Sequence, residues 1–116
     1  MCNAERKIRD ELQEVISLLV QKKYIELEEK SGGNRLKAYE IESAINEYGC
    51  DLAYPPEREF DSINMIEVFD SDPRRWSVRF DLWSEQEGKS DLSIELTIIE
   101  ASNKNTVVEI DDIHVL

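Results

Sequence analysis

The sequence is poor in the residues that build reactive or metal-binding centres. Its 116 residues include two cysteines, Cys2 and Cys50, and one histidine, His114. Zinc sites need three or four nitrogen, sulfur or carboxylate ligands in a fixed geometry, and a nucleophilic cysteine usually needs a basic partner. We therefore expect no metal, no cofactor and no enzymatic activity, and we interpret Cys50 and His114 as two unrelated residues.

Long hydrophobic runs are also missing. The longest apolar stretch, residues 16–20, is interrupted by Ser17, whereas a membrane-spanning helix needs about 20 predominantly apolar residues. Charged residues such as Glu5, Arg6 and Lys7 stand near the start, where a secretion signal would have its apolar core. We thus expect a cytoplasmic protein without membrane contact, in which the cysteines are free thiols.

Acidic residues, in contrast, are abundant. The chain has 26 Asp and Glu against 14 Lys and Arg, which gives a formal net charge of -12. Such a charge repels nucleic acid and anionic membrane surfaces, so we expect neither as a partner. The acid is unevenly distributed, because the first fifty residues hold eight basic and ten acidic residues, whereas residues 51–116 hold six and sixteen.

Hydrophobic residues in the first fifty positions recur at steps of three and four, the spacing of amphipathic helices. This spacing predicts a helix over residues 4–22, a short second helix over 24–29 and a third over 37–48. Gly32 and Gly49 follow the second and third segments, and glycine commonly ends a helix in the left-handed conformation. The apolar stripe of the first helix consists of Ile8, Leu12, Val15, Ile16, Leu19 and Val20.

After residue 49 the hydrophobic period changes to two, which is typical of strands. The alternation predicts long strands over residues 76–83, 91–98 and 106–115, and shorter extended segments at 52–54 and 63–69. Because short turns join the three long strands, we expect them to form an antiparallel meander.

Two local features complete the strand half. The stretch 57–62 is charged and predicts a polar connection. In the last strand the alternation slips between Ile110 and Ile113, and a β-bulge near Asp111 and Asp112 would return the apolar residues to the inward face.

Helices followed by a meander predict a single α+β domain over residues 1–116. Each predicted helix has one apolar stripe and each long strand has one apolar face. The economical arrangement packs the N-terminal helices across the concave face of a curved antiparallel sheet.

The polar face of the predicted strands carries the candidate binding residues. Alternation places several carboxylates on it with Arg79 as the main basic residue, and Trp83 shares this parity, whereas Trp76 lies on the core parity. A tryptophan among carboxylates is typical of an interface with a basic partner. The candidate partner-binding residues are Asp81, Trp83, Asp91, Glu95, Glu109 and Asp111.

Three other interpretations of this face stay open. It is equally consistent with a solvated surface that keeps the protein soluble. Paired carboxylates also serve hydrolases, although no pocket is apparent around them in the sequence. Glu109, Asp111 and Asp112 suggest a cation site, but neighbouring strand residues rarely converge on one point.

Parts of the strand half resemble a known group of proteins. The stretches WSVRFDLWS (76–84), SDLS (90–93) and IDDIHVL (110–116) are similar to those of small acidic bacterial proteins, in particular immunity proteins of contact-dependent inhibition and other polymorphic toxin systems. The order of elements resembles nuclear-transport-factor-2-like and cystatin-like folds. The resemblance implies a role in toxin neutralisation, and it assigns no functional residue.

These observations favour a non-enzymatic binding protein, most concretely an immunity protein that blocks a basic toxin nuclease by stoichiometric occlusion. The main alternative is a small-molecule-binding or enzymatic domain with a pocket between helices and sheet. A third is a module that forms a homodimer through its sheet. We expect the isolated protein to be a monomer or a weak dimer.

Overall fold

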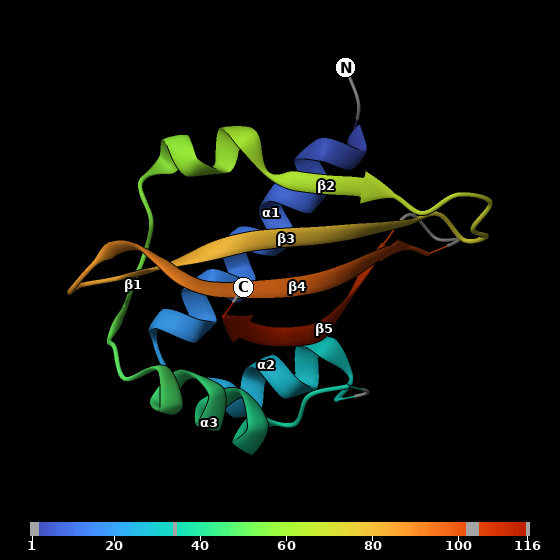
Figure 1. Cartoon of the computed structure of the whole chain (residues 1–116). Coiled ribbons are helices and arrows are strands. Elements are labelled where there is room, and N and C mark those ends of the chain that lie inside the picture. The colour runs from blue at the N-terminus through green and yellow to red at the C-terminus, as the bar shows by residue number, and fades with distance from the viewer. Residues whose placement is uncertain (1–2, 34, 102–104, 116) are drawn as a thin grey trace.

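The protein consists of a five-stranded antiparallel sheet with helices on one face and along one edge (Figure 1). A computed structural model describes residues 3–33, 35–101 and 105–115. Helices come first and the long strands follow, so the predicted α+β class is confirmed. Within the described residues, no helix is both long and apolar enough to cross a membrane.

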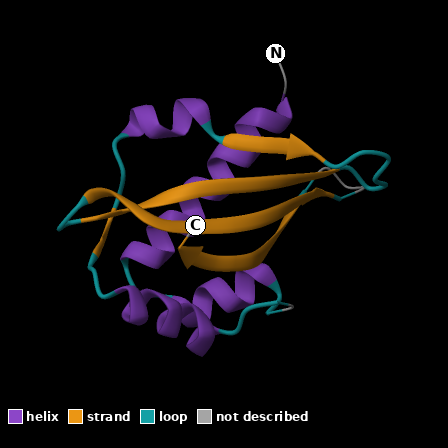
Figure 2. Cartoon of the chain, in the orientation of Figure 1, coloured by secondary structure: helices purple, strands orange, loops and turns teal. Residues whose placement is uncertain are grey.

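The observed elements lie close to the predicted ones (Figure 2). Gly32 and Gly49 end α2 and α3 with φ of 74° and 83°, left-handed values that glycine adopts without strain. The elements are α1 (Asn3–Val20), α2 (Tyr24–Ser31), α3 (Ala38–Tyr48), β1 (Leu52–Ala53), the 3-10 helix η1 (Glu57–Ser62), β2 (Asn64–Glu67), β3 (Arg75–Ser84), β4 (Gly88–Glu100) and β5 (Thr106–Val115).

Strand β3 is the centre of the sheet. It pairs with β4 on one side, and β4 pairs with β5, so these three strands form the predicted meander. On its other side β3 pairs with two short strands, with β1 near Ser84 and with β2 between Trp76 and Arg79. All pairs are antiparallel.

The hydrophobic core lies between α1 and the inner face of the sheet. Helix α1 crosses this face, whereas α2 and α3 pack beside β5 at the edge of the sheet (Figure 1). Burial of the apolar stripe of α1 against the apolar strand faces is the main stabilising term. Core residues at most 2% exposed include Ile8, Leu12, Ile16 and Leu19 of α1 and Val78, Leu82, Ile94, Leu96, Ile98, Val108 and Ile110 of the strands.

The segment 57–62 differs from the predicted polar connection. It forms η1, whose Phe60 is only 2% exposed and stacks on Phe80 with ring centroids 5.1 Å apart. Arg9 of α1 holds η1 in place, with Nη1 2.8 Å from Asp61 Oδ1. One aromatic residue among charged neighbours has no periodicity, so the sequence pattern missed this anchor.

The β-bulge predicted in the last strand is confirmed. Leu96 of β4 pairs with Ile110, but the preceding residue, Glu95, pairs with Asp112. Asp111 is therefore the extra residue of β5. Because the bulge shifts the alternation by one, the apolar residues on both of its sides stay buried. These are Ile110 and Ile113, at 2% and 5% exposure.

A substitution at the centre of β4 tests this packing. Ile94 is 0% exposed, so Ile94→Ala should lower the free energy of unfolding by about 2–5 kcal/mol through lost burial and a residual cavity. Urea denaturation measures this loss. The control Ile25→Ala changes a residue that is 72% exposed on α2 and should stay within about 0.5 kcal/mol. Equal losses in the two variants would contradict the described core.

A charged contact joins α2 to α1 and β5. Lys30 Nζ lies 2.8 Å from Glu11 Oε1 and 3.2 Å from Glu14 Oε1, and the Thr106 hydroxyl donates to the second oxygen of Glu11. The side chains of Lys30 and Glu11 are 20% and 14% exposed. Burial opposes the charge of Lys30, but the hydrogen bonds to both glutamates outweigh it and raise the pKa of Lys30.

Lys30→Met should therefore destabilise the protein by about 1–3 kcal/mol, because Glu11 loses its cation while it stays partly buried. Urea denaturation at neutral pH measures the difference, with Lys23→Met, an exposed lysine just before α2, as the control. A raised pKa stabilises the fold fully below the unfolded value of 10.5, and this contribution is lost as the pH rises through the folded value. The two proteins should thus converge in stability in strongly alkaline solution.

Candidate functional site

The face of the sheet that points away from α1 is left open by the helices of the described chain (Figure 1). We call it the outer face. Alternate strand residues point to opposite faces, and burial alternates along β3 and most of β4 and β5. The outer face is formed by Asn64 and Ile66 of β2, Arg75, Ser77, Arg79, Asp81 and Trp83 of β3, Ser93, Glu95, Thr97 and Ile99 of β4, and Val107, Glu109, Asp111, Asp112 and His114 of β5.

Glu95 lies at the centre of this face. It is in register with Arg79 of β3 and with Asp112 of β5. The imidazole of His114 lies between the two carboxylates, with Nε2 3.3 Å from Glu95 and Nδ1 3.0 Å from Asp112. His114 Nδ1 has no hydrogen-bond partner among the described residues, so its approach to Asp112 is a close contact without hydrogen-bond alignment. Among the described residues, no three His, Cys, Asp or Glu side chains are arranged to hold a metal.

Asp111, the bulge residue, contacts the chain on two sides. The Thr97 hydroxyl donates to Oδ2 at 2.6 Å. Arg35, in the loop before α3, places Nε 3.0 Å from Oδ1 as an ion pair without hydrogen-bond alignment. Glu109 is in register with Thr97 on the same face. Glu109 and Asp111 thus place carboxylates along β5, on the same face as Glu95 of β4 and Asp81 of β3.

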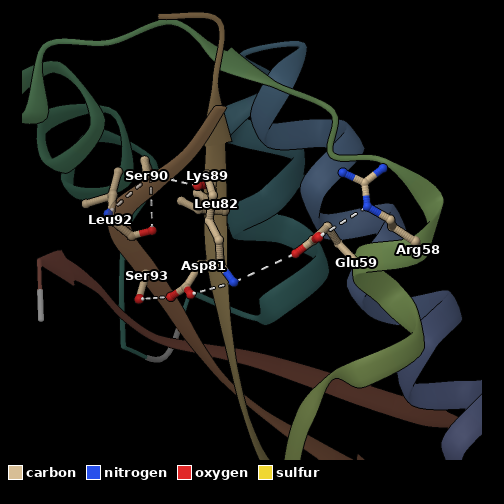
Figure 3. Close-up of polar contacts among 8 residues, drawn as sticks. All are labelled: Arg58, Glu59, Asp81, Leu82, Lys89, Ser90, Leu92 and Ser93. Carbon is tan, nitrogen blue, oxygen red and sulfur yellow. Dashed lines mark hydrogen bonds and ion pairs between the residues drawn. The ribbon is translucent and has the colours of Figure 1, made fainter. Parts of the chain in front are cut away.

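Asp81 shares a lysine with the 3-10 helix (Figure 3). Lys89 Nζ lies 3.7 Å from Asp81 and 3.9 Å from Glu59 of η1, and the Ser93 hydroxyl donates to Asp81 at 2.8 Å. A cleft of about 180 Å³ opens between η1 and β3, and Arg79 also lines it. The outer face is therefore hollowed beside Asp81.

Asp91 lies apart from the other five predicted residues. The register shifts here, so residues 90–92 of β4 lie opposite Leu82 alone. Figure 3 shows the Ser90 hydroxyl donating to the Leu82 carbonyl, at 2.6 Å. The backbone N–H of Asp91 donates to the hydroxyl of Tyr48 on α3, at 3.1 Å. The irregular segment breaks the alternation on which the prediction rested, and Asp91 belongs to the hairpin end beside α3.

The thiol of Cys50 lies near the same hairpin end. Burial raises its pKa, and the charges of Glu87 and Asp51 raise it further. Since the thiolate is the nucleophilic form, this environment disfavours Cys50 as a catalytic residue. The hydroxyl of Tyr48 donates to Glu87 at 2.7 Å, which raises the pKa of that tyrosine.

The two tryptophans differ in burial as the strand parity predicts. Trp76 is 6% exposed, and the Arg74 guanidinium lies 4.8 Å above its ring. Trp83 is half-buried, with its ring close to the backbone of Gly88. Its indole N–H is buried without a hydrogen-bond partner among the described residues. Trp83 therefore offers part of its ring, but not its donor, to the outer face.

A comparison with protein families places this chain. Residues 16–116 match the family described as Domain of unknown function (DUF7668). The chain belongs to this family. The DUF7668 match runs from the second half of α1 through β5 and so includes the whole outer face. No curated protein and no solved structure matches the chain, and the resemblance to immunity proteins and to nuclear-transport-factor-2-like or cystatin-like folds stays a prediction.

Sequence reasoning missed three residues of this DUF7668 chain that contact the predicted ones. Arg35 reaches Asp111 from a distant loop, which no periodicity reveals. The bulge in β5 shifts the alternation by one residue, so that His114 points to the outer face. The predicted bulge could therefore have indicated the orientation of His114. Lys89 stands directly after the hairpin glycine, and its outward direction follows only from the observed register.

Fluorescence quenching tests the orientation of the two tryptophans. Trp76→Phe and Trp83→Phe each leave one tryptophan, and acrylamide, a neutral quencher, is not repelled by the carboxylates. The variant that retains Trp83 should be quenched more strongly, because Trp76 is buried in the core. Equal quenching, or stronger quenching of Trp76, would show that β3 has the opposite register.

Proposed function

We propose that the protein is a non-enzymatic binding protein whose outer face recognises a basic protein partner. The observation that carries this proposal is an open face, three long strands wide, that gathers five predicted residues on one side of the sheet. Complementary charge speeds encounter and excludes wrong partners. These residues are Asp81, Trp83, Glu95, Glu109 and Asp111.

The cations beside Asp81 and Asp111 are held weakly enough for a partner to replace them. Lys89 is 57% exposed and lies 3.7 Å or more from its two carboxylates, and Arg35 is 59% exposed beside Asp111. Exposed ion pairs of this kind contribute about 0–1 kcal/mol. A bidentate arginine of a partner forms a stronger contact with a carboxylate, so replacing the internal cation costs little.

The main alternative is a pocket between helices and sheet, and a hollow of this kind, of about 440 Å³, lies between α3 and the strands β4 and β5. Another hollow of about 400 Å³ lies between the start of α1 and the segment around Phe60. Arg6 and Arg9 line this hollow, and Arg9 already pairs with Asp61 and with Glu57, at 2.8 Å and 3.6 Å. A ligand beside Arg9 would have to compete with both carboxylates, and the hollow beside α3 is lined by none of the predicted binding residues. The outer face gathers five of them and is therefore the better-supported site.

In its most concrete form, the proposal is an immunity protein that neutralises a toxin nuclease by stoichiometric occlusion. Nucleases carry basic surfaces because they bind phosphates. An inhibitor that covers such a surface needs carboxylates on a rigid scaffold, and it needs no chemistry of its own. The resemblance of the strand half to small acidic immunity proteins supports this form, with the cytoplasm as its place of action.

Charge reversal on the outer face tests the proposal. The partner is captured from the native host, identified by mass spectrometry and purified. Asp81→Lys, Glu95→Lys and Glu109→Lys together should then lower its association rate constant about tenfold or more, and added salt should mimic the substitutions. Trp83→Ala should instead speed dissociation, with a loss of about 2 kcal/mol. Surface plasmon resonance separates the two rates.

Glu42→Lys is the matched control, because it reverses one exposed carboxylate on α3, away from the outer face. Each single reversal on the face should slow association more than this control does. If the triple variant associates as fast as the wild type, the outer face is a solvated surface and the proposal fails.

A further inference from the structure

The charge at the centre of the outer face depends on the protonation of His114. It is the only histidine of the chain, and histidine is the side chain that ordinarily titrates between about pH 5 and 8. Its Nε2 lies 3.3 Å from Glu95 and its Nδ1 lies 3.0 Å from Asp112. An imidazolium at this place is therefore in direct contact with two carboxylates of the outer face.

The charged groups around the imidazole come from β3, β4, β5 and α3. Arg79 of β3 is in register with Glu95 of β4, and Glu47 of α3 lines the same hollow as His114. Together with Asp112, these three carboxylates and one guanidinium give a charge of -2 while the imidazole is neutral, and protonation reduces it to -1. Protonation of His114 therefore removes half of the local charge that attracts a basic partner.

Solvent and a partner can both reach this group of side chains. The side chains of His114 and Glu95 are 33% and 39% exposed, and that of Asp112 is 54% exposed. A lysine or arginine of the partner that contacts either carboxylate also comes close to the imidazole. Two cations at such a distance repel each other, so a proton on His114 and the partner compete for the same carboxylates.

The strand register holds the imidazole on this face. His114 is in register with Ser93 of β4, and its neighbour Ile113 is buried in the core at 5% exposure. The backbone N–H of Ile113 donates to Asp112 Oδ1 at 2.9 Å, and the second oxygen, Oδ2, is the one that lies beside His114. Because the core keeps Ile113 inward, the alternation of β5 keeps His114 outward beside its two carboxylates.

We propose that His114 makes partner binding depend on pH: the basic partner binds tightly while the imidazole is neutral, and protonation of the imidazole weakens the complex. This inference rests on the binding function proposed above and adds the regulation of the same face by protons. Linkage is reciprocal, so the partner must also displace protons from His114 as it binds.

Isothermal titration calorimetry with the purified partner between about pH 8 and about pH 5.5 tests this coupling. The wild type should lose affinity about fivefold or more as the pH falls. His114→Gln, which stays neutral, should lose most of this dependence, and His114→Lys, which stays charged, should bind weakly at both ends of the range. Tyr39→His, which adds an imidazole at a residue 72% exposed on α3, is the matched control and should behave as the wild type does. Circular dichroism confirms the fold of each variant.

Proton release gives a second readout. In buffers of different ionisation enthalpy near the middle of the range, the wild type should release more protons on binding than His114→Gln does. Equal pH dependence and equal proton release in these two proteins overturn the inference. If the triple charge reversal still slows association in that case, the binding function stands and only its regulation by His114 fails. If the triple variant associates as fast as the wild type, the binding function fails and this inference fails with it.

Discussion

The molecule is organised by a single constraint: three long strands have one apolar face each, and one amphipathic helix covers them. The stripe of α1 fills the inner face, where Leu12, Ile94 and Leu96 are fully buried. Helices α2 and α3 then pack along β5 and leave the other face open. Because side chains alternate with period two, the same register that closes the core also selects which residues the open face presents.

The bulge at Asp111 shows how closely core and surface are linked. Without the extra residue, the alternation of β5 would turn Ile113 outward and His114 inward. With it, Ile113 is 5% exposed in the core and His114 lies between Glu95 and Asp112 on the outer face. The extra residue, Asp111, therefore keeps Ile113 in the core and places His114 beside Glu95 and Asp112.

Structural features that depend on the spacing of apolar residues could be predicted from the sequence. The helix ends at Gly32 and Gly49, the three long strands, the bulge and the burial of Trp76 all follow from local spacing and turn chemistry. Periodicity did not reveal Phe60, a single aromatic residue among charges that becomes core only through its stacking on Phe80. Nor did it reveal the contacts of Arg35 and Lys89 or the displacement of Asp91, which depend on distant loops and on an irregular register.

We propose that the outer face contacts the partner and that the helices support it from the other side of the sheet. Hydroxyl-radical footprinting of the complex with the purified partner tests this claim most directly, because aromatic side chains and histidine react readily and lie on both sides of the molecule. If the outer face binds the partner, Trp83 and His114 lose reactivity in the complex, while Tyr39, 72% exposed on α3, keeps its own. Protection of Tyr39 with unchanged reactivity of Trp83 and His114 would contradict it.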